Sequence, residues 1–168
     1  MSDGTMIAYL PENGAWCKQE FPHMTLAYGA PVADMKDSDL NAMAKDAISA
    51  ARITGPFSLP VTGVEEWGES ERVDVLVLYP TPQLLLARNL VKHWDKSEFK
   101  EFKPHATVGP AGSAFADTVS YVDDGSSANE YRRYDRRYVS ETLPDRLYFN
   151  RIAVCWGDKK LIFNTNSF

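Results

Sequence analysis

A four-residue pattern occurs once in each half of the chain and limits the folds that the chain can adopt. Residues 22–25 (PHMT) and 104–107 (PHAT) share the form Pro-His-x-Thr, and each is followed by apolar residues and a glycine. Each copy predicts a short strand, since apolar runs bounded by proline and glycine are typical of strands. The repetition indicates a duplicated unit in which two similar strands are related by pseudo-twofold symmetry.

Further strands are predicted from short apolar runs elsewhere in the chain. They lie at residues 6–10, 57–61 and 73–79, and a terminal hairpin joins residues 152–156 and 161–163 through a turn at 157–158. The run at 73–79 is nearly continuous and is typical of a central strand. Pro60 cannot donate a backbone hydrogen bond, so it predicts an edge strand or a bulge.

Two helices are predicted between these strands. Apolar residues at helical spacing over 40–51 indicate a helix that Asp37 or Ser38 caps and that ends before Gly55. Thr81, followed by a proline, predicts the start of a second helix. Its expected buried face carries Ala87, Leu90, Val91 and Trp94. Mixed strands and helices without a visible boundary predict an α+β fold in which residues 1–168 form one domain.

The two Pro-His-x-Thr copies also predict a chemical site. Residues two apart in a strand point to the same face, so His23 projects with Thr25, and His105 with Thr107. If the two strands are close, two imidazoles and two hydroxyls converge. One imidazole can accept a proton while the other donates one near neutral pH. The hydroxyls can stabilise charge on an oxyanion. These groups suit metal-independent cleavage of a phosphodiester.

Composition excludes several other classes of protein. The chain has 168 residues and a net charge of −5, which argues against a protein that coats long nucleic acid. Two cysteines do not make a disulfide scaffold, and a reduced cytoplasmic setting is expected. No signal peptide or membrane span is expected. Neither a metal nor a cofactor is expected, because threonine is a poor metal ligand and the motifs hold no carboxylate.

The sequence resembles the two-histidine phosphoesterase superfamily, which includes RNA 2′-5′ ligase-like proteins and cyclic phosphodiesterases. The similar segments are FPHMTLAY (21–28), PFSLPVTGVEEW (56–67), residues 73–94, FKPHATVG (102–109) and residues 147–163. Residues 112–146 depart from the family pattern.

The resemblance implies a bilobal α+β domain, with pseudo-twofold strand and helix units and antiparallel sheets around a central cleft. It implies His23 and His105 as catalytic acid and base, in an order that the sequence leaves open, and Thr25 and Thr107 as phosphate-binding residues. Family substrates include 2′,3′-cyclic phosphates, 2′-5′-linked oligonucleotides and cyclic signalling nucleotides. Some phage members destroy the nucleotide messengers of bacterial defence systems. A small nucleotide or oligonucleotide is the expected substrate.

Further residues are candidates for substrate binding. Phe21 either contacts a base or packs against the first strand. Lys103 either adds positive charge to the cleft or is solvated at the strand edge. Tyr28, at the end of the first motif strand, is a third candidate. The EYRRYDRRY segment (130–138) is either a nucleotide-binding surface or an amphipathic helix with solvated arginines, and the second interpretation is favoured.

Two rival functions fit the same residues. One is a nucleotide- or RNA-binding module that keeps the cleft but has lost catalysis. The other is a ligase-like activity that runs the same chemistry in reverse, although the chain has no ATP-binding P-loop. The sequence does not set the oligomeric state, the base or the linkage of the substrate.

Overall fold

The computed structural model describes residues 3–97, 101–114 and 143–167. Its strands are β1 (Gly4–Pro11), β2 (Met24–Pro31), β3 (Phe57–Trp67), β4 (Val73–Leu78), β5 (His105–Pro110), β6 (Arg146–Trp156) and β7 (Lys159–Asn164). Its α-helices are α1 (Asp37–Thr54) and α2 (Pro82–Val91), and short 3-10 turns cover Val32–Asp34, Lys92–Trp94 and Thr165–Ser167. The 130–138 segment lies outside the described residues.

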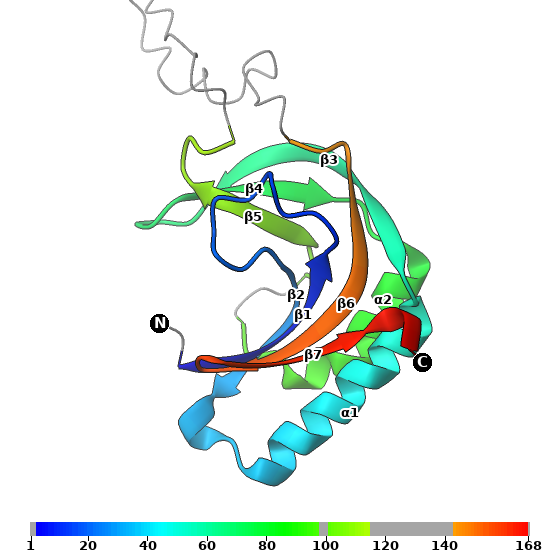
Figure 1. Cartoon of the computed structure of the whole chain (residues 1–168). Coiled ribbons are helices and arrows are strands. Elements are labelled where there is room, and N and C mark those ends of the chain that lie inside the picture. Colours follow the sequence, from blue (N-terminus) through cyan, green and yellow to red (C-terminus); the bar gives the residue numbers. More distant parts are fainter. Residues whose placement is uncertain (1–2, 98–100, 115–142, 168) are drawn as a thin grey trace, which may run out of the picture.

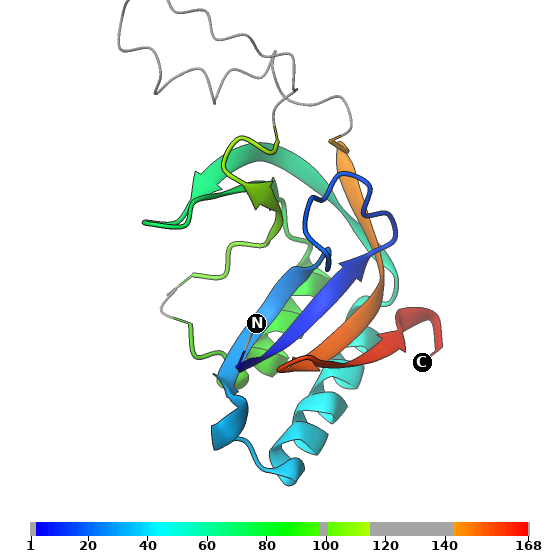
Figure 2. The same ribbon diagram turned by 60° about the vertical axis from the view of Figure 1, so that its left-hand side comes forward.

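All seven strands belong to one antiparallel sheet in the order β1-β2-β5-β4-β3-β6-β7. Strand β1 also pairs with β6, so the pairing closes on itself and β7 is added outside β6. Figure 1 shows the resulting curved sheet, and Figure 2 shows α1 and α2 together on one side of it. The α+β fold with antiparallel strands is therefore confirmed, and the strands of both halves form a single continuous sheet.

The main core lies between the sheet and the two helices. It contains fully buried residues from both motif strands, from α1 and from α2, including Met24, Ala106, Met43, Ala47, Leu84 and Ala87. A smaller apolar cluster of Leu10, Ala153 and Cys155 is separate from this core, and Met6 and Phe21 pack against it. Alternation along β1 and β6 places this cluster on the sheet face opposite the helices. Neither described helix is long and apolar enough to cross a membrane.

The strongest local signals gave the correct elements. Thr81 caps α2, because its Oγ1 accepts the Leu84 N–H at 3.2 Å, and proline occupies the first helical position. The terminal hairpin turns at Gly157, whose φ of 60° is a conformation that glycine adopts without strain. Trp94 lies beyond the end of α2 in a 3-10 turn, although it still packs against the core.

The predicted cap of α1 is wrong. Asp37 and Ser38 already lie inside the helix, and Lys36 is the cap residue. The backbone N–H of Lys36 donates to the Asp39 carboxylate at 2.9 Å. Asp37 and Asp39 both lie in the first turn, where negative charge stabilises the positive end of the helix dipole. The helix therefore begins at Asp37, one residue earlier than it would if Asp37 were the cap.

Strand β3 is longer than predicted and changes partner along its length. Phe57–Pro60 pairs with β6, whereas Val61–Trp67 pairs with β4. Pro60 therefore lies where the partner changes, and the register is irregular between Val61 and Gly63. The edge-strand interpretation is wrong, because β3 lies between β4 and β6. Pro60 itself pairs with Arg146, and the irregular register follows it in the chain.

Tyr9 links the sheet to α1 and gives a test of this packing. Its ring is fully buried, and its hydroxyl lies 3.3 Å from the Ala50 carbonyl and 2.8 Å from Thr54 Oγ1. Tyr9→Phe should lower the free energy of unfolding by about 1 kcal/mol, the usual net value of such hydrogen bonds. Urea unfolding measures this change. Tyr79→Phe, at a position 65% exposed, should have no effect, and an equal loss there would contradict the assignment.

Candidate active site

The two motifs meet where β2 pairs with β5. Met24 and Ala106 are antiparallel partners, and both are fully buried on the helix side of the sheet. The residues that flank them point to the other face, because side chains alternate along a strand. Continuing the register by one residue sets His23 opposite Thr107, and Thr25 opposite His105. The four motif side chains therefore form one half-buried group on the face away from the helices.

Each imidazole is oriented by a backbone carbonyl two residues earlier. His23 Nδ1 lies 2.7 Å from the Phe21 carbonyl oxygen, and His105 Nδ1 lies 2.9 Å from the Lys103 carbonyl oxygen. A carbonyl only accepts, so Nδ1 carries the hydrogen and Nε2 of the neutral ring keeps a lone pair. Both histidines are thus prepared in the same way to exchange a proton at Nε2.

The proline of each motif lies between the histidine and the residue whose carbonyl holds it. Phe21 precedes Pro22 and Lys103 precedes Pro104. A residue before proline is restricted to extended conformations, which limits the direction of its carbonyl. The proline therefore helps to fix the acceptor for the ring as well as the start of the strand.

An aromatic ring lies against each histidine. Phe21 stacks on His23 with centroids 5.4 Å apart and an interplanar angle of 27°. Trp67 lies against His105 with centroids 4.2 Å apart and an angle of 50°. Lysines cover the two aromatic rings, Lys160 Nζ at 4.6 Å from the Phe21 centroid and Lys103 Nζ at 5.3 Å from the Trp67 centroid. The local symmetry thus extends beyond the four motif residues.

Burial lowers the pKa of both histidines. The main cause is the loss of solvent around each imidazole, which disfavours its charged form, and the hydrogen bond to the carbonyl partly offsets this. The positive charges of His23 and Lys103 lower the pKa of His105 further. The two imidazoles are therefore close enough to influence each other, and both favour the neutral form.

The two threonines lie on the face of the histidines, and Tyr28 lies farther along β2. Thr25 Oγ1 donates to the Met6 sulfur at 3.2 Å, and a thioether is a weak acceptor that the hydroxyl can readily leave. Tyr28 is the cross-strand partner of Met6, so it shares the motif face, and it is 46% exposed. Thr107 is half-buried on β5.

Phe21 contacts His23 and Lys103 contacts His105, but the side chains of both also bind other parts of the protein. Phe21 packs on the small apolar cluster as well as on His23, and Lys103 forms an ion pair with Glu65 at 2.9 Å. Sequence reasoning missed Trp67, which contacts His105 from β3, and Glu65, which binds both Trp67 and Lys103. The predicted strand covered only residues 57–61, whereas β3 continues to Trp67, so no local signal placed either residue beside the second motif.

Two other residues with reactive or titratable side chains lie at the edge of the site or outside it. The Cys17 thiol donates to the Thr107 carbonyl at 3.4 Å, and burial raises its pKa, which favours the unreactive thiol. His93 pairs with Asp46 at 3.3 Å and is largely exposed, as expected for a surface residue. Within residues 3–97, 101–114 and 143–167, no three His, Cys, Asp or Glu side chains are grouped as metal ligands would be.

Comparison with known proteins gives structural matches only. No protein-family model matches the sequence, and no curated protein matches it. Usb1 of Kluyveromyces marxianus is similar over 97% of this chain and 98% of its own, with 9% identity and a TM-score of 0.59. A structure described as a phosphoesterase is similar over 98% of this chain and 95% of its own, with 13% identity and a TM-score of 0.54.

LigT of E. coli in complex with NADP+ is a further match. It is similar over 98% of this chain and 95% of its own, with 14% identity and a TM-score of 0.52. These identities are low, so the likeness concerns the backbone. The chain therefore has the same fold as Usb1 and LigT.

Proposed function

We propose that the chain is a metal-independent phosphodiesterase that cleaves a ribonucleotide phosphodiester by two-histidine acid and base catalysis. The observation that supports this most directly is the pairing of Met24 with Ala106. This pairing sets two histidines and two threonines on one face, and each histidine has Nδ1 bound to a carbonyl and Nε2 available.

The proposed reaction uses the two imidazoles in opposite protonation states. Nε2 of the neutral histidine accepts a proton from the attacking water or ribose hydroxyl as the new P–O bond forms. Nε2 of the protonated histidine gives its proton to the leaving oxygen as the old P–O bond breaks. The hydroxyls of Thr25 and Thr107 donate to the non-bridging phosphate oxygens, where negative charge builds up. The histidines exchange proton states in one turnover, and solvent restores them.

Structural neighbours support a nucleotide-sized substrate. A Usb1 structure from Kluyveromyces marxianus contains uridine monophosphate, and E. coli LigT structures contain NADP+ and 3′-AMP. In this chain, two aromatic rings flank the histidines, and the surrounding face carries the exposed Tyr28. Aromatic rings beside a phosphate-binding group suit a ligand that joins a base to a phosphate.

Product analysis by liquid chromatography and mass spectrometry tests this function. The wild-type protein would be incubated in EDTA with 2′,3′-cyclic mononucleotides, 2′-5′ oligoadenylate and cyclic di- and trinucleotides. Cleavage of one class in EDTA would support the proposal and identify the linkage. Activity that EDTA abolishes and added metal restores would overturn the metal-independent mechanism. Saturable binding of one class without any product would favour a binding module.

The lowered histidine pKa values predict an acidic pH optimum. The reaction needs one neutral and one protonated imidazole, so its profile is bell-shaped between the two apparent pKa values of the pair. Both pKa values lie below the ordinary 6.5, so kcat/KM should be highest below pH 6.5. Steady-state kinetics in overlapping buffers measure this optimum, and an optimum on the alkaline side of neutrality would contradict it.

The same pKa shifts predict a change in stability with pH. As the pH falls below 6.5, the unfolded chain binds protons at these imidazoles before the folded chain does. The free energy of unfolding should therefore decrease as the pH drops through the lowered pKa values of the folded state. Urea unfolding at several pH values, with the His23→Ala/His105→Ala variant for comparison, isolates this contribution.

A further inference from the structure

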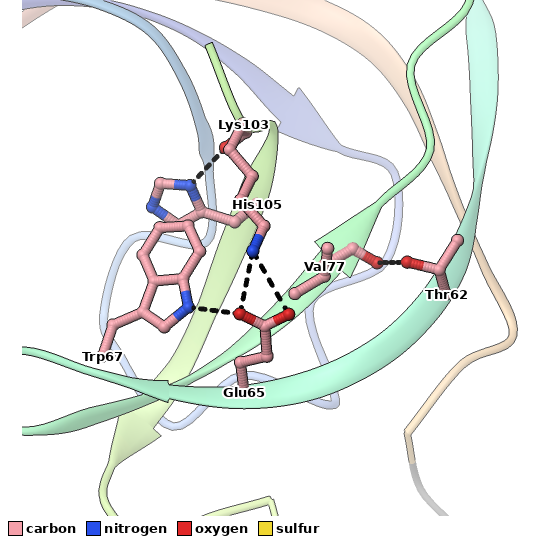
Figure 3. A network of polar contacts seen from close by, with 6 residues as sticks. All are labelled: Thr62, Glu65, Trp67, Val77, Lys103 and His105. Carbon is pink, nitrogen blue, oxygen red and sulfur yellow. Dashed lines mark hydrogen bonds and ion pairs between the residues drawn. The ribbon is translucent and has the colours of Figure 1, made fainter. Parts of the chain in front are cut away.

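Glu65 joins two residues that both contact His105. Its carboxylate accepts the Trp67 Nε1–H at 3.0 Å, and it accepts Lys103 Nζ at 2.9 and 3.3 Å through its two oxygens. Figure 3 shows this carboxylate between the indole and the ammonium group. These hydrogen bonds lower the pKa of Glu65, so it remains ionised across the pH range in which histidine titrates.

Trp67 and Lys103 hold His105 in different ways. The indole ring lies against the imidazole at 4.2 Å, and the Lys103 carbonyl binds Nδ1 at 2.9 Å. The side chain of Lys103 covers the indole ring and ends on Glu65. Each of these four residues therefore contacts the next in a ring (Figure 3). The order is His105, Lys103, Glu65, Trp67 and again His105.

The strand register explains why a residue on β3 can act on β5. Glu65 and Trp67 are two positions apart on β3, so they share a face. Glu65 pairs with Val75 on β4, and Val75 pairs with Thr107 on β5. Glu65, Val75 and Thr107 are therefore cross-strand neighbours on one face of the sheet, the face that bears the second motif.

His23 has a different environment. Its ring stacks on Phe21, which has no hydrogen-bonding group, and Lys160 covers that ring. Among the described residues, no carboxylate forms an ion pair with Lys160. The two motifs are thus equivalent in their histidines, threonines and carbonyl acceptors. In the described residues, only the surroundings of His105 include a carboxylate that is paired with the covering lysine.

We propose that Glu65 is a positioning residue for His105, which rests on the phosphodiesterase function proposed above. It fixes Trp67 and the Lys103 side chain around the imidazole, and it offsets the positive charge of Lys103. Glu65 acts through these two residues and does not touch the reacting atoms.

The charges near His105 determine the direction in which the pKa of His105 should change when Glu65 is replaced. The charged groups that act on His105 are Lys103, on the preceding segment, and His23, beside β2. Glu65 on β3 pairs with Lys103, and the β4 partner of His105 is the apolar Val77. Removing the Glu65 charge leaves Lys103 without its counter-ion. The protonated imidazole then faces a stronger positive field, so the pKa of His105 should fall.

Proton NMR titration of Glu65→Gln tests this coupling without any substrate. The amide of Gln can still accept the Trp67 N–H, but it carries no charge. We expect the His105 ring signal to titrate roughly 0.5 to 1 pH unit lower than in the wild type. The chain has three histidines, and His93, which pairs with Asp46, should not change. A His105 titration that is unchanged or moves upward would overturn the proposal.

Two further variants separate the charge effect from general disturbance. Glu71→Gln removes the same charge from the exposed β3–β4 connection, and it should leave the His105 titration unchanged. In Glu65→Gln/Lys103→Met both charges are absent, so the His105 pKa should return toward its wild-type value. A downward shift of equal size in Glu71→Gln, or no recovery in the double variant, would contradict a specific role for Glu65.

The pH–rate profile of Glu65→Gln then connects this coupling to catalysis. The limb that depends on His105 should move to lower pH by the same amount as its titration, and the other limb should move less. A shift of the alkaline limb would identify His105 as the acid, and a shift of the acidic limb would identify it as the base. Unmoved limbs despite a shifted titration would overturn the positioning role in catalysis. Wild-type protein without activity would refute the phosphodiesterase function while the titration still tests Glu65.

Discussion

His105→Ala and His23→Ala should each lower kcat by about 10²- to 10⁴-fold on whichever phosphodiester the wild type cleaves. Each imidazole has Nδ1 committed to a backbone carbonyl, so only Nε2 can exchange a proton with substrate. Alanine removes that nitrogen, and solvent is a poor substitute. The two histidines act on one transition state, so the double variant should lose much less than the product of the two single losses.

His93→Ala is the matched control for these two variants. His93 is the third histidine of the chain, and it pairs with Asp46 beside the helices. Its replacement should leave kcat unchanged. Circular dichroism and thermal unfolding establish whether each variant keeps its fold. A folded His23→Ala or His105→Ala protein that turns over at the wild-type rate would refute two-histidine catalysis.

The sequence predicted the elements whose signals are local. The α2 cap needs only Thr81 and the following proline, and the terminal hairpin needs only alternation and a glycine turn. The start of α1 was wrong because Asp39 binds the Lys36 backbone from inside the helix. The full length of β3 was missed because its two halves are held by different strands, β6 and β4, which local periodicity does not reveal.

The shared face within each motif was predictable, whereas the assembled site was not. Period-two alternation sets His23 with Thr25, and His105 with Thr107, in any extended strand. That the two strands are neighbours depends on the Met24–Ala106 pair, which the buried core between the sheet and the helices holds in place. The sequence of either motif alone does not show which distant strand it pairs with.

The phenylalanines upstream of the motifs illustrate the same limit. Phe21 and Phe102 both precede a motif in the sequence, but Phe21 lies two residues before its histidine and Phe102 lies three residues before its own. Phe21 stacks on His23, whereas Phe102 packs against the core and lies 5.2 Å from the Arg88 guanidinium. In the second copy, Trp67 on β3 provides the ring that contacts the histidine. A similar contact is therefore made by residues that no alignment of the two motifs would pair.

Thr25→Val and Thr107→Val should each lower kcat by roughly 10²- to 10³-fold, the usual effect of removing one donor to a developing oxyanion. Valine keeps the size and branching of threonine, so the strand packing is retained while the hydroxyl is lost. The only Thr25 side-chain hydrogen bond seen in the described part of the chain goes to the Met6 sulfur, a weak acceptor. Thermal unfolding of Thr25→Val should therefore differ little from that of the wild type.

Thr25→Ser and Thr107→Ser separate the hydroxyl from the methyl group. Serine restores the donor, so both variants should regain most of the lost kcat, although a freer rotamer should leave them below the wild type. Inactive serine variants, or active valine variants, would contradict phosphate stabilisation by the threonine hydroxyls. Since each threonine lies opposite the histidine of the other motif, a loss in kcat for both would mean that the two halves act on the same phosphate.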